Sequence, residues 1–487
     1  MVNRAVPQLQ PDGVAGRDIR EDEEKMSEAD EAERHGAVAE GPRPDWLHVP
    51  ADLNKLHPEI WSRTAERGAD GVLRIGGISV TDLAEEFGTP AYLFDEDDFK
   101  ARCAEFRAAF HDFDIYYAGK AFLCRAAARL VAEAGLSMDV CTGGELKVAL
   151  AAGFPAERIV MHGNNKSDEE VEYAAAHGVG RYVVDSFDEI DRLTGLGRRH
   201  DVRPRVLVRV SVGVKADTHA NIATAHDDQK FGFPLVDGDA AEAVRRILAD
   251  GVLDLLGLHI HIGSQIFGTE GFEAGTRRVL ALHAAIAREH AVELPELSLG
   301  GGFGIAYTSA HHPLSPVELA ARLRAIAADE CAALAIPVPR LAIEPGRAIV
   351  GPAGTTLYRV GTVKHLSGLR TYVSVDGGMS DNIRPALYDG VYATVLAGRS
   401  SAQGPMLSRV VGKHCDAGDI VSRDDYLPAD VRIGDMVAVP GTGAYCRSLS
   451  NNFNHVPRPP VVAVSRGQAR VIIRRETDED LLRLDVG

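Results

Sequence analysis

The chain has 487 residues, 45% of them hydrophobic and 25% charged, which provides a large core and exceeds the length of one ordinary domain. Its formal net charge of -17 argues against a nucleic-acid partner, because such proteins carry a basic face. No apolar run reaches the roughly 18 residues that a membrane span requires. Its six cysteines lack C-x-x-C spacing, which favours reduced thiols in a cytoplasmic protein.

Residues 1–43 differ in composition from the rest of the chain. Acidic residues cluster between Glu21 and Glu33, and aromatic residues are absent. Such a segment cannot bury enough apolar surface to offset its ordering entropy, so we expect a disordered, solvated tail. Met26 is an alternative start that would shorten this tail.

Residues 44–95 read as a short helix and strands. We predict strands over 72–75, 78–80 and 91–94 and a helix over 81–87. A strand pair of this kind needs sheet partners, so we expect the segment to pack against a β-rich domain later in the chain.

Residues 96–346 contain eight short apolar runs, which alternate with stretches of helical spacing such as 144–152 and 241–248. The runs span 115–121, 137–142, 158–163, 181–186, 205–212, 253–263, 297–303 and 340–346. Eight strand–helix units in a row predict an α/β chain with a (β/α)8 TIM barrel. Such barrels place active sites at the C-terminal ends of their strands. Those ends carry Lys120, Asp139, His162, Asp185, Arg209, His259, His261, three glycines, Glu344 and Arg347.

Residues 347–487 change to strands separated by turn signals. We predict strands over 356–363, 371–376, 406–412, 435–439, 460–464 and 469–474. Asp-Gly-Gly, Gly-Asp and Arg-Gly sequences lie between them. The pattern indicates a C-terminal β-rich domain.

Lys120 lies among apolar and aromatic residues at the end of the first barrel strand. Desolvation disfavours an ammonium group, so we expect a lowered pKa and a lysine able to form a Schiff base with an aldehyde cofactor. For the lysine in isolation, a side chain that extends from a strand end into solvent is the favoured interpretation.

The glycines at 300–302 favour the first interpretation, because barrel enzymes often hold a phosphate with backbone N–H groups after the seventh strand. Ser264 is a further phosphate ligand of the predicted site, although a glycine triplet alone also fits a simple turn. The last strand adds Glu344 and Arg347. A lysine, a phosphate site and a buried carboxylate are together what pyridoxal 5'-phosphate requires.

His259 and His261 lie on one face of their strand. With His162 they have ligands for a metal, but no H-E-x-x-H pattern accompanies them and we predict no metal. We expect one of the two histidines to stack on the cofactor and the other to be a core residue.

Nine motifs in order resemble the diaminopimelate decarboxylase family, fold-type III pyridoxal-phosphate enzymes related to ornithine decarboxylase and alanine racemase. The resemblance runs from about residue 48 to 487. The motifs are YYAGKAF (116–122), DVCTGGEL (139–146), HGNNKS (162–167), HIHIGSQ (259–265), GGGFGI (300–305), EPGR (344–347), DGGMSDNIRPALY (376–388), GKHCDAGD (412–419) and TGAYCRSLS (442–450).

The resemblance implies an alanine-racemase-like fold and a homodimer that decarboxylates meso-2,6-diaminopimelate to L-lysine and CO2, the last step of lysine biosynthesis. It assigns Lys120 and Cys415 as catalytic, with Cys415 supplied by the second subunit as the proton donor. The implied cofactor residues are Lys120, Asp139, His261, Ser264, Gly302, Glu344, Pro345, Gly346, Arg347 and Tyr445. The implied substrate residues are Arg347, Arg384, Tyr388, Asp416 and Tyr445.

Three positions depart from the family's pattern: Asp416 replaces the usual glutamate, Phe453 replaces a tyrosine, and 217–221 lacks an expected glutamate. The shorter carboxylate of Asp416 moves its oxygen by about 1.5 Å. A paralogous decarboxylase of ornithine, lysine or another amino acid is therefore an alternative. An alanine-racemase-like enzyme would not need Cys415, and a pyridoxal-phosphate carrier would lack the β-rich domain.

Overall fold

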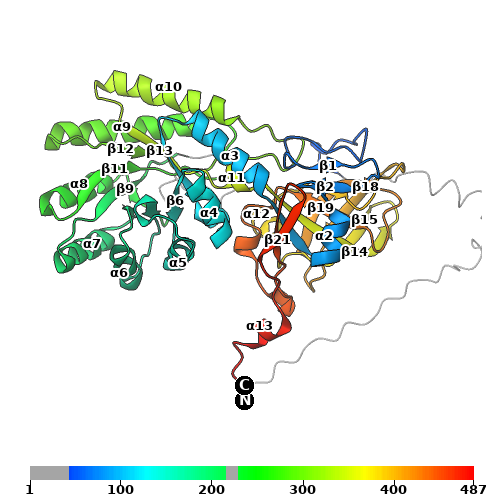
Figure 1. The fold of residues 1–487 in the computed structure, drawn as a ribbon. Helices are drawn as coiled ribbons and strands as arrows, with labels where there is room; N and C mark the ends of the chain where they lie inside the picture. The colour runs from blue at the N-terminus through cyan, green and yellow to red at the C-terminus, as the bar shows by residue number, and fades with distance from the viewer. Residues whose placement is uncertain (1–42, 215–228) are drawn as a thin grey trace, which may run out of the picture.

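The computed structural model describes residues 43–214 and 229–487, which form a barrel and a β-rich domain side by side (Figure 1). The predicted tail, with Met26, and the segment 217–221 lie outside the described residues, apart from Arg43 at the end of the tail. No helix within the described ranges is both long and apolar enough to cross a membrane.

The barrel is closed by eight parallel strands, so the predicted fold class is confirmed. They are β5 (Asp114–Ala118), β6 (Ser137–Val140), β7 (Ile159–Met161), β8 (Arg181–Val184), β9 (Arg205–Ser211), β11 (Asp254–His259), β12 (Glu296–Ser298) and β13 (Arg340–Ile343), with the short β10 (Phe233–Pro234) beside β9. Each strand ends before the predicted run does, because the residues that follow form the loops of the barrel mouth.

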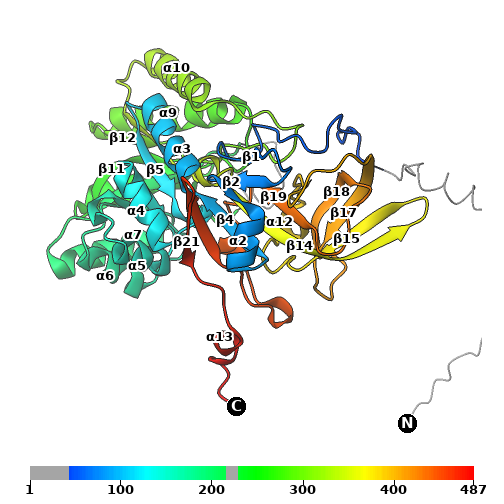
Figure 2. The same cartoon turned by 45° about the vertical axis from the view of Figure 1, so that its right-hand side comes forward.

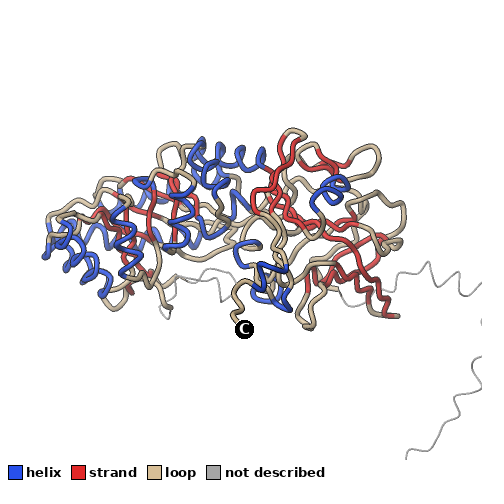
Figure 3. The backbone as a smooth tube through the Cα atoms, turned by 60° about the horizontal axis from the view of Figure 1, so that its bottom comes forward, coloured by secondary structure: helices blue, strands red, loops and turns tan. Residues whose placement is uncertain are grey.

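Helices surround the barrel strands, as the view from below shows (Figure 3). They are α4 (Arg125–Glu133), α5 (Gly143–Ala151), α6 (Asp168–Ala176), α7 (Phe187–His200), α8 (Asp239–Asp250), α9 (Glu270–His290) and α10 (Pro316–Leu334). After β13 only the short α11 (Arg347–Val350) follows, and α3 (Glu96–Ala109), which precedes β5, packs against α10 and α11. A helix from before the first strand thus covers the position that the eighth crossover helix would take.

The start of α10 illustrates why these segments become helices. Ser315 accepts a hydrogen bond from the Glu318 backbone, and the Glu318 carboxylate accepts one from the Ser315 backbone. This capping box satisfies two amides that would otherwise lack partners, and Pro316 suits the first helical position. Leu319, Leu323 and Ala327 then recur at helical spacing and are buried.

The β-rich domain is built on the long strand β14 (Gly354–Leu366), which pairs with three other strands. The main sheet has the order β18-β17-β15-β14-β4-β20-β21, with β19 pairing β14 and β16. The strands are β4 (Ala91–Asp95), β15 (Arg370–Val375), β16 (Val395–Leu396), β17 (Pro405–Val411), β18 (Ile420–Pro428), β19 (Met436–Pro440), β20 (Val461–Ser465) and β21 (Gln468–Ile473); the helices of this part of the chain are α12 (Arg384–Tyr388) and α13 (Asp478–Leu482). All six predicted strands are present; β16 and β18 are additional.

The segment before the barrel contributes one strand to this sheet. β4 lies between β14 and β20. A separate sheet of β1 (Glu66–Arg67), β2 (Leu73–Ile75) and β3 (Ile78–Ser79), with α2 (Val80–Phe87), shares a hydrophobic cluster with residues of the main sheet such as Leu93 and Val462.

A buried ion pair joins the loop after β7 to α7. Lys166 is 1% exposed, and its Nζ donates to Glu189 Oε1 at 2.5 Å, to the Gly163 carbonyl at 2.8 Å and to the Val183 carbonyl at 2.7 Å. Glu189 also accepts from the Asp185 backbone at 2.9 Å. All polar atoms of the pair have partners, which is the condition under which a buried charge is tolerated.

Replacing Lys166 by Met should lower the free energy of unfolding by about 3–5 kcal/mol, because it leaves the Glu189 carboxylate buried without its cation. Chemical denaturation followed by fluorescence measures the change. The control is Arg192→Met, which removes the exposed pair with Asp168 between the neighbouring helices α7 and α6 and should cost less than about 1 kcal/mol. Equal losses in the two variants would contradict the structural role of Lys166.

Candidate active site

A pocket lies at the C-terminal ends of the barrel strands and is closed on one side by Tyr445 from the β-rich domain. It is lined by Ala118, Lys120, Asp139, His261, Ser264, Gly302, Phe303, Glu344, Gly346, Arg347 and Tyr445. Every residue predicted to hold the cofactor lines this pocket except Pro345, whose carbonyl accepts a hydrogen bond from the Ala118 backbone at 3.1 Å. Phe303 and Ala118 are additions that the sequence analysis does not name.

Lys120 lies in a 3-10 turn directly after β5, with its side chain exposed to the pocket. Burial of the surroundings disfavours the ammonium group. The Tyr445 hydroxyl, the Cys141 thiol and the Asp139 carboxyl outweigh this effect and raise the pKa of Lys120 above its usual value. The predicted lowering is therefore wrong, because groups that are remote in sequence surround the amine and outweigh its desolvation.

The Glu344 carboxylate is the centre of a buried polar network at the floor of the pocket. Its Oε1 is 3.0 Å from His259 Nε2 and 3.4 Å from His162 Nε2, and it accepts a hydrogen bond from Ser298 Oγ at 3.0 Å. Burial opposes ionisation of Glu344, but the imidazoles of His259 and His162 outweigh it and hold its pKa well below the usual range. Burial also lowers the pKa of His162 to about 4, so this imidazole is neutral at neutral pH.

The pKa of Asp139 is shifted in the opposite direction from that of Glu344. Burial and the neighbouring Glu344 carboxylate raise the pKa of Asp139 well above its usual value, although Lys120 opposes them. Its Oδ1 is buried and has no hydrogen-bond partner among the described residues. The pocket thus holds two carboxyl groups whose pKa values are shifted in opposite directions, an arrangement typical of active sites.

The same network contains the candidate metal ligands. One ligand atom each from His162, His259 and Glu344 lies within 4.8 Å of the others. The geometry would accommodate an ion, but it equally satisfies a carboxylate held by two imidazoles. His259 is buried in the core, whereas His261 lines the pocket. The His261 Nδ1 accepts from the Gly301 backbone at 3.2 Å, and burial lowers its pKa well below the usual value.

The glycine loop after β12 lies tightly against the ends of two neighbouring strands. A Cβ on Gly301 would be 2.1 Å from the Glu344 carbonyl oxygen. Gly302 has φ of +108°, and its Cβ would be 2.3 Å from the Gly263 carbonyl oxygen. These distances exclude any side chain, so the loop is more than a simple turn and exposes its backbone to the pocket.

Arg347 connects the barrel mouth to the β-rich domain. Its guanidinium donates to Tyr307 Oη at 2.5 Å and Ser264 Oγ at 2.8 Å, and it lies over the Tyr445 ring at 4.6 Å. Tyr445 has φ of +64°, which is costly for a bulky residue, and its backbone donates to the Ala121 carbonyl at 2.8 Å. A contact with the lysine turn thus holds this conformation.

Arg384 packs against Tyr307 and does not itself line the pocket. It is buried at the start of α12, its guanidinium hydrogen bonds to Tyr392, and it lies 4.9 Å from the centre of the Tyr307 ring. Tyr307 therefore contacts both predicted substrate arginines. Sequence reasoning does not identify Tyr307 or Tyr392; the position of Tyr307 two residues after the GGGFGI motif is a signal that could have done so. Tyr388 is half-buried at the other end of α12.

Cys415 and Asp416 do not line the pocket of their own chain. Both are exposed, on the loop between β17 and β18. The Cys415 backbone donates to Asn454 Oδ1 at 3.1 Å, and Asp416 Oδ1 accepts from the Gly418 backbone at 2.7 Å. Of the predicted site residues, these two are exposed and lie outside the pocket of their own chain.

The chain matches the family model for the pyridoxal-dependent decarboxylase, pyridoxal binding domain, over residues 96–351. It is 51% identical to the diaminopimelate decarboxylase of Mycobacterium tuberculosis (strain ATCC 25618 / H37Rv), covering 89% of this chain and 99% of the relative. It is 43% identical to that of Bacillus subtilis (strain 168), covering 87% and 97%. The crystal structure of diaminopimelate decarboxylase from M. jannaschii with L-lysine superposes with a TM-score of 0.82 at 30% identity, covering 88% of this chain and 98% of that one.

Replacing Gly302 by Ala should lower the free energy of unfolding by about 2–4 kcal/mol, because the residue has positive φ and its Cβ would collide with backbone. Denaturant titration measures this loss. Gly404→Ala is the matched control, since a Cβ there meets nothing within 4 Å, and should change stability by no more than about 0.5 kcal/mol. A neutral Gly302→Ala would show that the loop does not need its close approach to Gly263.

Proposed function

Because this chain belongs to the diaminopimelate decarboxylase family of pyridoxal-dependent lyases, we propose that the pocket at its barrel mouth is where it removes one carboxylate of meso-2,6-diaminopimelate as CO2. The reaction yields L-lysine and is the last step of lysine biosynthesis. The observation that carries the assignment is that Lys120, from the turn after β5, lines one pocket with Glu344 and Arg347, from the segment after β13. The alternative of another amino-acid substrate is not favoured, given 51% identity over most of the chain.

The residues present fit pyridoxal 5'-phosphate. The pocket combines an accessible lysine amine, a buried ionised carboxylate and a loop in which Gly301 and Gly302 carry no side chains. Arg347 Nε is buried without a hydrogen-bond partner among the described residues, as expected where an anionic group belongs. When bound, the cofactor supplies an aldehyde that captures an amine and an electron-withdrawing ring that stabilises charge on the carbon losing its carboxylate.

Each pocket residue has a distinct task in this proposal. Lys120 would hold the aldehyde end of the cofactor. Glu344, kept ionised by its two histidines, would accept a hydrogen bond from the ring nitrogen, and the neutral His261 would lie against the ring. Ser264, Gly302, Tyr445 and the turn from Glu344 through Pro345 and Gly346 to Arg347 would hold the phosphate end, and Asp139 would complete the site as a carboxyl whose pKa is raised.

The substrate's second carboxylate would be bound at the end of the pocket marked by Arg347 and Arg384, with Tyr388 and Tyr445. Packing two guanidinium groups against one tyrosine side chain costs free energy, because like charges repel, unless an anion binds between them. A substrate with a carboxylate at each end supplies that anion, whereas ornithine and lysine do not. Asp416 would accept hydrogen bonds from the distal ammonium.

We propose a homodimer, which is supported by the positions of Cys415 and Asp416: both are exposed and lie outside the pocket of their own chain. In our proposal each subunit presents this loop to its partner's pocket, where Cys415 Sγ donates a proton to the carbon that has lost CO2. The C-terminal segment supports an intersubunit contact, because Leu482, Leu484 and Val486 are exposed on it.

We further propose a domain division at 44–95, 96–346 and 347–487, in which the first segment belongs with the β-rich domain through β4. The cytoplasm is the compartment that six unpaired cysteines support.

The function is tested by product analysis of the purified protein with pyridoxal phosphate. Lysine and CO2 should form from diaminopimelate, and neither cadaverine from L-lysine nor putrescine from L-ornithine should appear. Lys120→Ala should lower kcat by about three orders of magnitude or more, whereas the exposed Lys147→Ala should retain wild-type activity. Cadaverine or putrescine as the main product would contradict the substrate assignment.

Shared active sites are tested by mixing two inactive variants, Lys120→Ala and Cys415→Ala. In a hybrid dimer one site has both native residues, so random re-association should restore about a quarter of the wild-type activity by the symmetry of a twofold dimer. Native mass spectrometry verifies that hybrids form. No recovery despite hybrid formation would place Cys415 in the site of its own subunit.

A further inference from the structure

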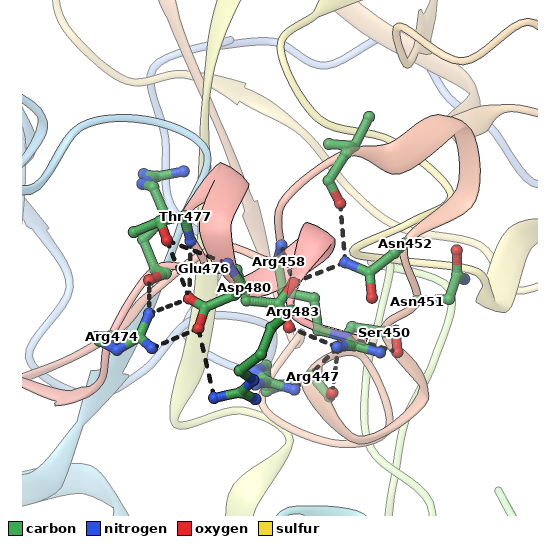
Figure 4. Close-up of polar contacts among 12 residues, drawn as sticks. Arg447, Ser450, Asn451, Asn452, Arg458, Arg474, Glu476, Thr477, Asp480 and Arg483 are labelled. Carbon is green, nitrogen blue, oxygen red and sulfur yellow. Dashed lines mark hydrogen bonds and ion pairs between the residues drawn. The ribbon is translucent and has the colours of Figure 1, made fainter. Parts of the chain in front are cut away.

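The C-terminal segment is attached to the loop that contacts Cys415. In two views this segment, which ends in α13, projects below the junction of the two domains, beside the loop that precedes β20 (Figures 1 and 2). The connection between them is polar, and its centre is Glu476 (Figure 4). The Glu476 carboxylate accepts from Asn452 Nδ2 at 2.7 Å, from the Arg458 backbone at 2.8 Å and from the Arg458 guanidinium at 2.6 Å.

The loop between these two contacts has an unfavourable backbone conformation. Asn454 has φ of +52° and His455 has φ of +54°. Consecutive non-glycine residues in this region cost free energy, and such conformations persist only where surrounding contacts fix them. Asn452 lies on one side of the pair and Arg458 on the other, so Glu476 fixes the loop at both ends of its strained part.

The strained pair is also where the loop contacts the predicted proton donor. Asn454 Oδ1 accepts from the Cys415 backbone amide at 3.1 Å. The neighbouring Phe453 ring lies 5.8 Å from the ring of His414. The loop is fixed on its other side by Asn451, whose backbone donates to the Ser380 carbonyl at 2.9 Å. A shift of this loop therefore moves the residue that orients Cys415.

We propose that Glu476 is a positioning residue for Cys415: it fixes the 452–458 loop in the conformation that directs the Asn454 amide oxygen to the Cys415 backbone. The inference rests on the proposed function of Cys415. In the proposed dimer, the C-terminal segment would therefore support the residues that one subunit contributes to the active site of its partner.

The adjacent carboxylate of Asp480 shows that Glu476 is not one member of a general surface network. Asp480 pairs with Arg474 and caps α13 through Thr477, contacts that remain within the C-terminal segment (Figure 4). Arg483 lies 4.0 Å from it, again within that segment. The contacts of Glu476 with the 452–458 loop instead connect this segment to the rest of the domain. Asp480→Asn is therefore a matched control.

The test compares Glu476→Gln, Asn454→Ala, the double variant and Asp480→Asn in the full-length holoenzyme. Glutamine keeps the size of Glu476 but replaces one carboxylate oxygen with an amide NH2 group, which cannot accept hydrogen bonds from the donors of Asn452 and Arg458. We expect kcat for diaminopimelate to fall about tenfold in Glu476→Gln, in line with a small displacement of a reacting group. Alkylation of Cys415 by iodoacetamide, resolved by peptide mass spectrometry, should become faster, and the melting temperature reports folding.

The double variant distinguishes positioning from general stabilisation. If Glu476 acts through Asn454, Glu476→Gln should cause no further loss of kcat and no further gain in alkylation rate in the Asn454→Ala background. Asp480→Asn should leave both quantities at wild-type values. If Glu476→Gln does not fold, Asn452→Ala, which removes one of the three hydrogen bonds, should show the same two effects to a smaller degree.

The inference is overturned if the effects of Glu476→Gln and Asn454→Ala on kcat multiply, or if Asp480→Asn changes kcat and the alkylation rate as much as Glu476→Gln does. Full activity of Cys415→Ala would instead contradict the proposed role of Cys415 itself. The alkylation rate would then still show whether Glu476 controls the environment of that thiol.

Discussion

The buried carboxylate of Glu344 is the constraint on which the barrel mouth depends. A charged carboxylate removed from water must be surrounded by donors, and here they come from different barrel strands: His259 from β11, Ser298 from β12 and His162 from the loop after β7. These donors reach Glu344 only if the strand ends meet in one register. The network that keeps the carboxylate ionised therefore also fixes the floor of the pocket.

Backbone contacts also fix the β-rich domain against the mouth of the barrel. Gly301 and Gly302 bring a loop so close to neighbouring strands that no Cβ fits, and Tyr445 keeps a strained conformation through a hydrogen bond to the turn that carries Lys120. The aromatic ring of Tyr307 then lies between Arg347 and Arg384. The pocket is thus formed from both domains, and neither contains all of its residues.

Much of this arrangement is predictable from sequence, because it depends on strand ends. Once eight parallel strands are recognised, Lys120, Asp139 and Glu344 must meet at one end of the barrel. The raised pKa of Lys120 is not predictable, since it depends on side chains that only the fold brings near the amine. Strand β18 is likewise not predicted: Arg423, Asp424 and Asp425 interrupt its apolar pattern, which an edge strand tolerates.

Two departures from the family's pattern lie within the described residues, at positions that the fold constrains little. Asp416 and Phe453 are exposed, and the Asp416 carboxylate hydrogen bonds to the backbone of its own loop, as short acidic side chains commonly do in turns. In the floor of the pocket, a substitution would leave a buried charge or a collision. At the exposed Asp416 a substitution leaves neither. The buried network of the barrel can therefore stay unchanged while exposed loops, fixed from behind by contacts such as those of Glu476, vary in sequence.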